Sequence, residues 1–192
     1  MTVRQAIVFG SNGGIGSAVA RKFLQNHHHL FLFSRDEAKL KANIDQLRRS
    51  APGSIVDGCA VDVCDARSIE SSVRYFQATS RSPISHLLLC AGVNQDRLLI
   101  KETDSNIEHI IQTNLISSIN ICRLYSKLML KQNQDSSIVL IGKAVLHFGW
   151  SADTFVKAIR TLLSIQCSPL KTESQEHLQG KPINSPRPPQ EA

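Results

Sequence analysis

The sequence predicts an α/β fold in which helices cover both faces of one parallel sheet. Three observations support this doubly wound arrangement. Short apolar runs of strand type alternate with longer segments of helical periodicity as far as about residue 142. The glycine-rich segment 10–16 joins the first apolar run to the first helical pattern. The chain has 192 residues, which is enough for one domain with a substantial core.

Composition and charge narrow the class of protein. The net charge of +6 is modest, and no basic run is interleaved with aromatic residues. We therefore expect no nucleic-acid partner, whereas a phosphorylated cofactor or an acyl carrier protein would suit a basic surface. The 5 cysteines show no metal-binding spacing, which predicts reduced, buried thiols of an intracellular protein. No segment predicts a signal peptide or a membrane span.

The first three strands are short apolar runs bounded by turn residues. They are expected at Arg4–Phe9, Leu30–Phe33 and Ile55–Val61. The first helix, Gly14–Gln25, follows the glycine turn, and the second, Asp36–Ser50, carries apolar residues at helical spacing up to the helix-breaking Pro52. Three histidines at 27–29 precede the second strand. Because adjacent residues point in different directions, we expect a solvated connection there and no metal site.

The second half of the chain continues the alternation. Asp65 is expected to cap a third helix, Ala66–Ala78, and Pro83 leads into a fourth strand, Ser85–Cys90. The remaining periodic segments predict a helix from Thr103 to about Leu130, a strand at Ser137–Ile141 and a helix at Ala152–Ile165.

These elements predict three parts of the chain. Residues 1–142 are expected to form a nucleotide-binding domain, and residues 143–167 a divergent helical segment. Periodicity is lost after Cys167, and the last stretch, Gly180–Ala192, is rich in proline. We therefore expect residues 168–192 to be a disordered tail.

The glycine turn has the context that a phosphate-binding loop requires, because a strand leads into it and a helix leaves it. Gly10 allows a tight exit from the strand, Gly14 would let the backbone approach a pyrophosphate, and Gly16 would let the helix pack close to the sheet. The helix N-terminus would offer N–H groups to the phosphates. A tight turn without a ligand is the alternative.

The end of the second strand bears on the choice of dinucleotide. A carboxylate about twenty residues after the glycines would bind the ribose 2′-hydroxyl of NAD. This sequence has Ser34 and Arg35 there, whose hydroxyl and guanidinium suit a 2′-phosphate. The pattern favours NADP(H). The alternative is that Arg35 is a solvated loop residue with no role in cofactor binding.

The spacing Gly10-x-x-x-Gly14-x-Gly16 at the start of the chain resembles that of the short-chain dehydrogenase/reductase family. Ala91 and Gly92 fit the family pattern after the fourth strand, where Leu89 replaces an asparagine. The stretch 92–99 resembles 3-oxoacyl-acyl-carrier-protein reductases and mitochondrial carbonyl reductases. The resemblance extends to Gly142 and implies a Rossmann-type sheet of order 3-2-1-4-5 that lacks the family's last strands.

The resemblance also implies site residues and a reaction, the reduction of a 3-oxoacyl thioester or another small carbonyl by NADPH. Asp62 would contact the adenine ring, with a cap or turn role as the alternative. Asn114 would lie at a helix kink and hold a water of the proton relay. The alternative is that Asn114 kinks the helix and has no catalytic role. The residues that would hold NADP(H) are Gly10, Asn12, Gly14, Ile15, Gly16, Ser34, Arg35, Asp62, Ala91 and Gly92.

After Gly142 the chain departs from the family pattern. The family has a serine directly after this glycine, then a tyrosine that hands over the proton and a lysine one helical turn later that lowers its pKa. Here the serine position is Lys143, and the 2 tyrosines of the chain lie in earlier helices. Asp153 and Lys157 have the spacing of the tyrosine and the lysine. Lys157 is therefore a candidate catalytic residue that would bind the nicotinamide ribose, with the polar face of a helix as the alternative.

Three explanations fit this ending: an alternatively spliced or mispredicted product of a reductase gene, a member that binds cofactor without turnover, or an enzyme with an unusual proton donor. The predicted function is an NADP(H)-dependent short-chain oxidoreductase lineage, linked through the 3-oxoacyl substrate to fatty acid biosynthesis. The alternative is a catalytically silent subunit or truncated isoform that forms homo-oligomers or pairs with a full-length reductase. The cytoplasm and the mitochondrial matrix both fit, the second through the resemblance alone.

Overall fold

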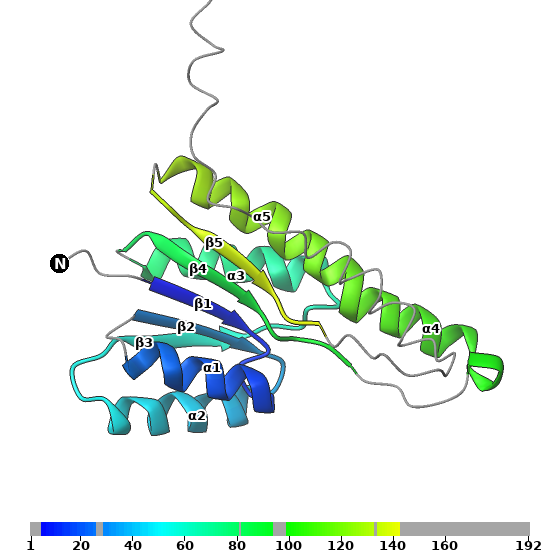
Figure 1. The fold of residues 1–192 in the computed structure, drawn as a ribbon, viewed down its shortest axis with the longest axis horizontal. Helices are drawn as coiled ribbons and strands as arrows, with labels where there is room; N and C mark the ends of the chain where they lie inside the picture. The colour runs from blue at the N-terminus through cyan, green and yellow to red at the C-terminus, as the bar shows by residue number, and fades with distance from the viewer. Residues whose placement is uncertain (1–4, 26–28, 81, 94–98, 133, 143–192) are drawn as a thin grey trace, which may run out of the picture.

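The computed structural model describes residues 5–25, 29–80, 82–93, 99–132 and 134–142, and its centre is a five-stranded parallel sheet. The strand order is β3-β2-β1-β4-β5, which confirms the predicted fold class and topology (Figure 1). The strands are β1 (Gln5–Phe9), β2 (His29–Ser34), β3 (Val56–Ala60), β4 (Ile84–Leu89) and β5 (Ser137–Leu140).

Helices cover both faces of the sheet (Figure 1). On one face lie α1 (Gly14–Gln25) and α2 (Glu37–Ser50), and on the other lie α3 (Ala66–Thr79) and α5 (Ser117–Lys131). Strand β1 is buried along its whole length, and its side chains alternate between the two layers. Ala6 and Val8 pack with α1 and α2, whereas Ile7 and Phe9 pack with α3 and α5. The central strand therefore holds the two layers together.

The two hydrophobic layers differ in composition. The buried residues of the layer under α1 and α2 are all aliphatic, with Phe23 packed against them, while the layer under α3 and α5 contains Phe9, Phe31, Phe33, Phe76 and Tyr125. Several of these rings meet edge to face; the centroids of Phe9 and Tyr125, for example, are 5.5 Å apart.

Side chains cap the starts of three helices. Asp36 accepts a hydrogen bond from the Lys39 N–H at 3.0 Å and caps α2. Asp65 caps α3 by accepting from the Arg67 N–H at 2.9 Å, as predicted. A 3₁₀ turn, Leu99–Lys101, precedes α4 (Asp104–Ile111), whose cap is Thr103.

The segment predicted as one helix from Thr103 is divided by a π-helical turn, Gln112–Ile116, between α4 and α5. In this turn the Ser117 N–H reaches back five residues to the Gln112 carbonyl. Serine hydroxyls supply the bonds that the wider turn leaves open: Ser117 donates to the Thr113 carbonyl at 2.5 Å, and Ser118 donates to the Asn114 carbonyl at 3.1 Å.

Other expectations need smaller corrections. His29 is not part of the connection but the first residue of β2, where it pairs with Gln5. The cysteines of the described chain are half-buried rather than buried: Cys59, Cys64, Cys90 and Cys122. In the part of the chain that the structure describes, no helix is long and apolar enough to cross a membrane.

Within the described residues β5 pairs with β4 alone, and Val139 on it is 43% exposed. The expectations for residues 143–167 and 168–192, including Lys143, Asp153 and Lys157, lie outside the described residues.

Candidate functional site at the carboxyl ends of the strands

The glycine loop is tied to the end of β2 by backbone hydrogen bonds. The N–H groups of Gly10 and Ser11 both donate to the Phe33 carbonyl, at 2.8 and 3.2 Å. Gly10 has a φ of +78°, and a Cβ there would lie 2.5 Å from the Ala91 nitrogen. Glycine is therefore required at this exit for its conformation and for the close approach of the segment after β4.

Two further glycines of the loop have different surroundings. A Cβ on Gly16 would collide with the carbonyl of Gly10, so this glycine allows α1 to start against the loop. A Cβ on Gly14 would meet no protein atom within 4 Å. Gly14 and the neighbouring Ile15 are exposed, whereas Gly16 is buried. The open side of the loop is thus at the first turn of α1, where the amide groups lack partners within the helix.

Asn43 of α2 holds the loop from the side, a role that sequence reasoning missed. Its Nδ2 donates to the Ser11 carbonyl at 3.2 Å and to Asn12 Oδ1 at 3.4 Å. Asn12 in turn donates to the Asp36 carbonyl at 3.3 Å. No local signal marks Asn43, because a polar residue in an amphipathic helix is the ordinary pattern.

A cavity of about 400 Å³ opens beside this loop at the carboxyl ends of the parallel strands. It brings together most of the predicted cofactor residues: Gly10, Asn12, Ser34, Arg35, Asp62, Ala91 and Gly92. Gly14, Ile15 and Gly16 are not part of its lining. Residues that were not predicted also line it: Gly13, Asp36, Lys39, Val61, Val63, Cys64, Cys90, Val93 and Thr113. Ligands of doubly wound sheets bind at this edge.

Asp62 has the turn role that was the alternative to an adenine contact. Its Oδ1 accepts a hydrogen bond from the Cys64 N–H at 2.9 Å, which makes it a turn aspartate. The Ser68 hydroxyl accepts from the Asp62 N–H at 3.0 Å, so the turn is fixed from both sides. The same residue lines the cavity. Its turn role and its position at the cavity are therefore compatible.

Asn114 is 2% exposed and lies in the π-helical turn. Its Oδ1 accepts from the Val93 N–H at 2.9 Å, and its Nδ2 donates to the Val93 carbonyl at 3.0 Å. The side chain thus pairs with the backbone of the segment after β4. A water in the relay that the resemblance implies would therefore share a side chain whose two polar atoms already hold Val93.

The two residues before Asn114 tie the π-helical turn to the loop after β3. Gln112 Nε2 donates to the Cys64 carbonyl at 3.0 Å, and the Thr113 hydroxyl lies 3.1 Å from the Cys64 sulfur. The turn therefore anchors two walls of the cavity at once, the segment after β3 and the segment after β4. This arrangement cannot be predicted from the sequence, because the contacts join residues that are far apart in the chain.

Neither tyrosine is placed to donate a proton at this cavity. Tyr125 is fully buried in the core, where its hydroxyl is 3.0 Å from that of Ser72, and burial raises its pKa far above the ordinary value. Tyr75 donates to Asp57 Oδ1 at 2.7 Å, beside β3. Burial and the bond to Asp57 raise the pKa of Tyr75 to about 12.

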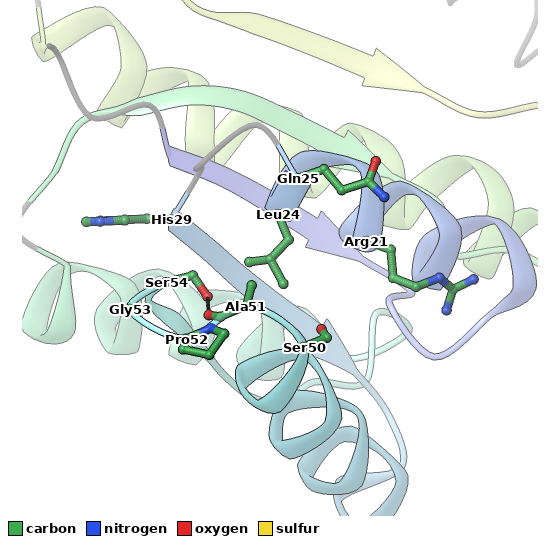
Figure 2. A pocket seen from close by; sticks show the side chains of 9 residues that line it. All are labelled: Arg21, Leu24, Gln25, His29, Ser50, Ala51, Pro52, Gly53 and Ser54. Carbon is green, nitrogen blue, oxygen red and sulfur yellow. Dashed lines mark hydrogen bonds between the residues drawn. The ribbon is translucent and has the colours of Figure 1, made fainter.

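A second cavity, of about 520 Å³, lies at the opposite edge of the sheet (Figure 2). The C-terminal ends of α1 and α2 reach it, and their carbonyl groups disfavour a phosphate. Its hydroxyls are also engaged: Ser50 donates to Leu47 at 2.9 Å, and Ser54 donates to Ala51 at 2.6 Å. The cavity beside the glycine loop is the better candidate for a dinucleotide, although it is smaller. Among the described residues no group of three or more His, Cys, Asp or Glu could hold a metal ion.

Comparisons with known proteins show the family to which the chain belongs. Residues 4–151 match the family model described as short chain dehydrogenase, so the chain belongs to this family of oxidoreductases. The chain is 31% identical over 140 residues to 3-oxoacyl-[acyl-carrier-protein] reductase of Bos taurus, covering 72% of this chain and 55% of that protein. It is 28% identical over 142 residues to carbonyl reductase family member 4 of Danio rerio, covering 74% and 57%. The chain thus spans little more than half the length of these relatives.

Solved structures show the same fold. L-sorbose reductase from Gluconobacter frateurii, complexed with NADPH and L-sorbose, superimposes with a TM-score of 0.76 at 19% identity. The match covers 85% of this chain and 62% of that one.

Proposed function

We propose that this chain binds NADP(H) in the cavity beside the glycine loop and descends from reductases of 3-oxoacyl thioesters or other small carbonyls. The observation that carries the proposal is the charge of the cavity where β2 ends. Ser34 and Arg35 line it at the end of β2, and the carboxylate that follows them, Asp36, caps α2 by accepting from the Lys39 N–H at 3.0 Å and lies 3.4 Å from the Lys39 ammonium. Because a hydroxyl and a guanidinium stand where a carboxylate would bind the ribose 2′-hydroxyl of NAD, the end of β2 favours a 2′-phosphate.

The geometry of the glycine loop also supports a dinucleotide. The open space at Gly14 and the first turn of α1 would accept the pyrophosphate, and Gly10 keeps the segment of Ala91 and Gly92 close to the loop. Asp62, at the far side of the cavity, would lie along the adenine. When bound, NADPH supplies a hydride to a carbonyl carbon, and the protein must supply a proton to the carbonyl oxygen.

The second candidate function is a catalytically silent, cofactor-binding or assembly subunit. It is favoured by the two tyrosines, which are engaged away from the cavity, and by Lys143 at the serine position. It is also favoured by an apolar patch on the outside of the helical segment, where Ile116 and Ile119 are 37% and 48% exposed and one turn apart. This face would pair with a second copy or with a full-length reductase.

Titration of the purified chain with NADPH and NADH, followed by addition of an acetoacetyl thioester, tests these proposals. Tight NADPH binding without oxidation supports the silent subunit, and steady oxidation supports an enzyme with an unusual proton donor. Binding of neither nucleotide refutes the cofactor site. Size-exclusion chromatography, alone and with a full-length 3-oxoacyl-acyl-carrier-protein reductase, tests the assembly role, and a chain that stays monomeric in both runs contradicts it.

A further inference from the structure

The corner of the cavity where α2 begins contains a charge arrangement that the cofactor residues predicted from sequence do not include. Asp36 and Lys39 both line the cavity, next to Ser34 and Arg35. The Lys39 ammonium lies 3.4 Å from Asp36 Oδ2, and the Lys39 side chain is 78% exposed. The lysine is therefore free to move between Asp36 and a ligand in the cavity.

Asp36 places a permanent negative charge in this corner. It caps α2 by accepting from the Lys39 N–H, and this hydrogen bond is the main cause that lowers the pKa of its carboxyl. The carboxylate therefore stays ionised at neutral pH, where it would repel a phosphate dianion held by Ser34 and Arg35. A second cation is needed in the same corner to offset this repulsion.

We propose that Lys39 is a specificity-determining residue that contacts the 2′-phosphate of NADP(H) and so separates NADPH from NADH. This inference rests on the proposed function, because it assigns a residue to the same nucleotide site. Lys39 lies one turn into α2, on the side of the helix that faces the cavity. Lys41, only two residues further on, is exposed and is not part of the cavity lining. Positions two apart on a helix do not face the same way, so Lys41 provides a control of equal charge.

The test compares dissociation constants for NADPH and NADH in the unaltered chain and in the variants Lys39→Gln and Lys41→Gln. Lys39→Gln should raise the dissociation constant for NADPH by about 5- to 10-fold, the range for the loss of one charge-assisted contact. The constant for NADH should rise by less than about 2-fold. Lys41→Gln should change either constant by less than about 2-fold. Circular dichroism of each variant checks that α2 is intact.

A third variant separates direct contact from simple charge balance. Asp36→Asn keeps a good helix cap and removes the negative charge, so it should tighten NADPH binding. If Lys39 contacts the phosphate, Lys39→Gln still weakens NADPH when Asp36→Asn is also present. If the loss disappears in that double variant, Lys39 acts only on Asp36 and the inference is wrong.

The remaining outcomes separate this inference from the proposed function. Equal losses in Lys39→Gln and Lys41→Gln, or equal losses for the two nucleotides, overturn the role of Lys39 and leave the cofactor site in place. If the unaltered chain binds neither nucleotide, the proposed function fails, and the role of Lys39 fails with it.

Discussion

The two halves of the sheet fix their loops at the carboxyl edge with the same kind of side chain, an asparagine. In the half formed by β1 to β3, Asn43 of α2 holds the glycine loop through Ser11 and Asn12. In the half formed by β4 and β5, Asn114 holds the segment after β4 through both polar groups of Val93. Each half uses one asparagine from a helix to fix a loop at the carboxyl edge of the sheet.

The halves differ in what those loops offer to chemistry. The first half presents a glycine turn, a serine and two cations at one cavity, all of which suit an anionic ligand. The second half contributes small residues and a buried asparagine, while the chain has Lys143 in place of the family's serine. Because nucleotide binding and proton donation depend on different strand ends, a chain of this family can keep the first while it changes the second.

Gly16 offers the largest expected effect, and it tests whether the first half depends on close packing at the loop. Gly16→Ala places a methyl group against the Gly10 carbonyl, and a backbone atom cannot move aside as a side chain can. We expect a loss of about 3 kcal/mol in the free energy of unfolding, from overpacking at a rigid contact. Urea denaturation measures this loss in the free energy of unfolding. A variant as stable as the unaltered chain, within error, would show that the loop can shift.

Asn114 and Asn43 allow the halves to be compared directly by the same substitution. Asn114→Ala removes a side chain that is 2% exposed and leaves the half-buried N–H and carbonyl of Val93 without their partner, which should cost about 2 kcal/mol. Asn43→Ala removes longer hydrogen bonds at a half-buried site and should cost about 1 kcal/mol. Urea denaturation ranks the two variants. The reverse order would mean that the glycine loop, and not the segment after β4, carries the stronger anchor.

Gly14 separates ligand binding from stability in the first half. A Cβ there meets nothing within 4 Å, and alanine is favoured over glycine in a helix, so Gly14→Ala should keep or slightly raise the melting temperature. The same methyl group would occupy the space proposed for the pyrophosphate. It should therefore weaken the binding of NADPH by about 10-fold, or ~1.4 kcal/mol. Unchanged NADPH binding would remove Gly14 from the proposed site. Gly16→Ala is the matched variant for the stability measurement.

Tyr75 gives the smallest effect and tests whether its phenol is structural. Its pKa of about 12 lies above the ordinary value of 10.0, so the folded chain holds this proton more tightly than the unfolded chain. Its contribution to stability is complete below about pH 10 and is lost as the pH rises toward 12. Burial likewise raises the pKa of the Cys59 thiol to about 11, which adds a loss between about pH 9 and 11.

Urea denaturation at several pH values between about pH 8 and 11 measures this loss. Tyr75→Phe should make the loss shallower while leaving nucleotide binding at neutral pH unchanged. An altered NADPH affinity in Tyr75→Phe would contradict a purely structural phenol.

The strand order was implied by the resemblance to the family, whereas the alternation of strands and helices and the glycine loop were predictable from the sequence alone. These features depend on local patterns, namely apolar periodicity, capping at Asp65 and the spacing of Gly10, Gly14 and Gly16. The sequence also revealed the departure from the family pattern after Gly142, because a missing serine and tyrosine can be seen without coordinates.

Only the tertiary structure decided which side chains meet around the cavity. The pairing of Asn114 with Val93 and the support of Asn12 by Asn43 join residues more than twenty positions apart. The position of Lys39 beside Arg35 depends on how α2 starts against the end of β2. Local patterns determine which elements form, whereas the packing of the elements determines which polar groups face one another. The fold was therefore predictable from the sequence, and the contacts that build the site were not.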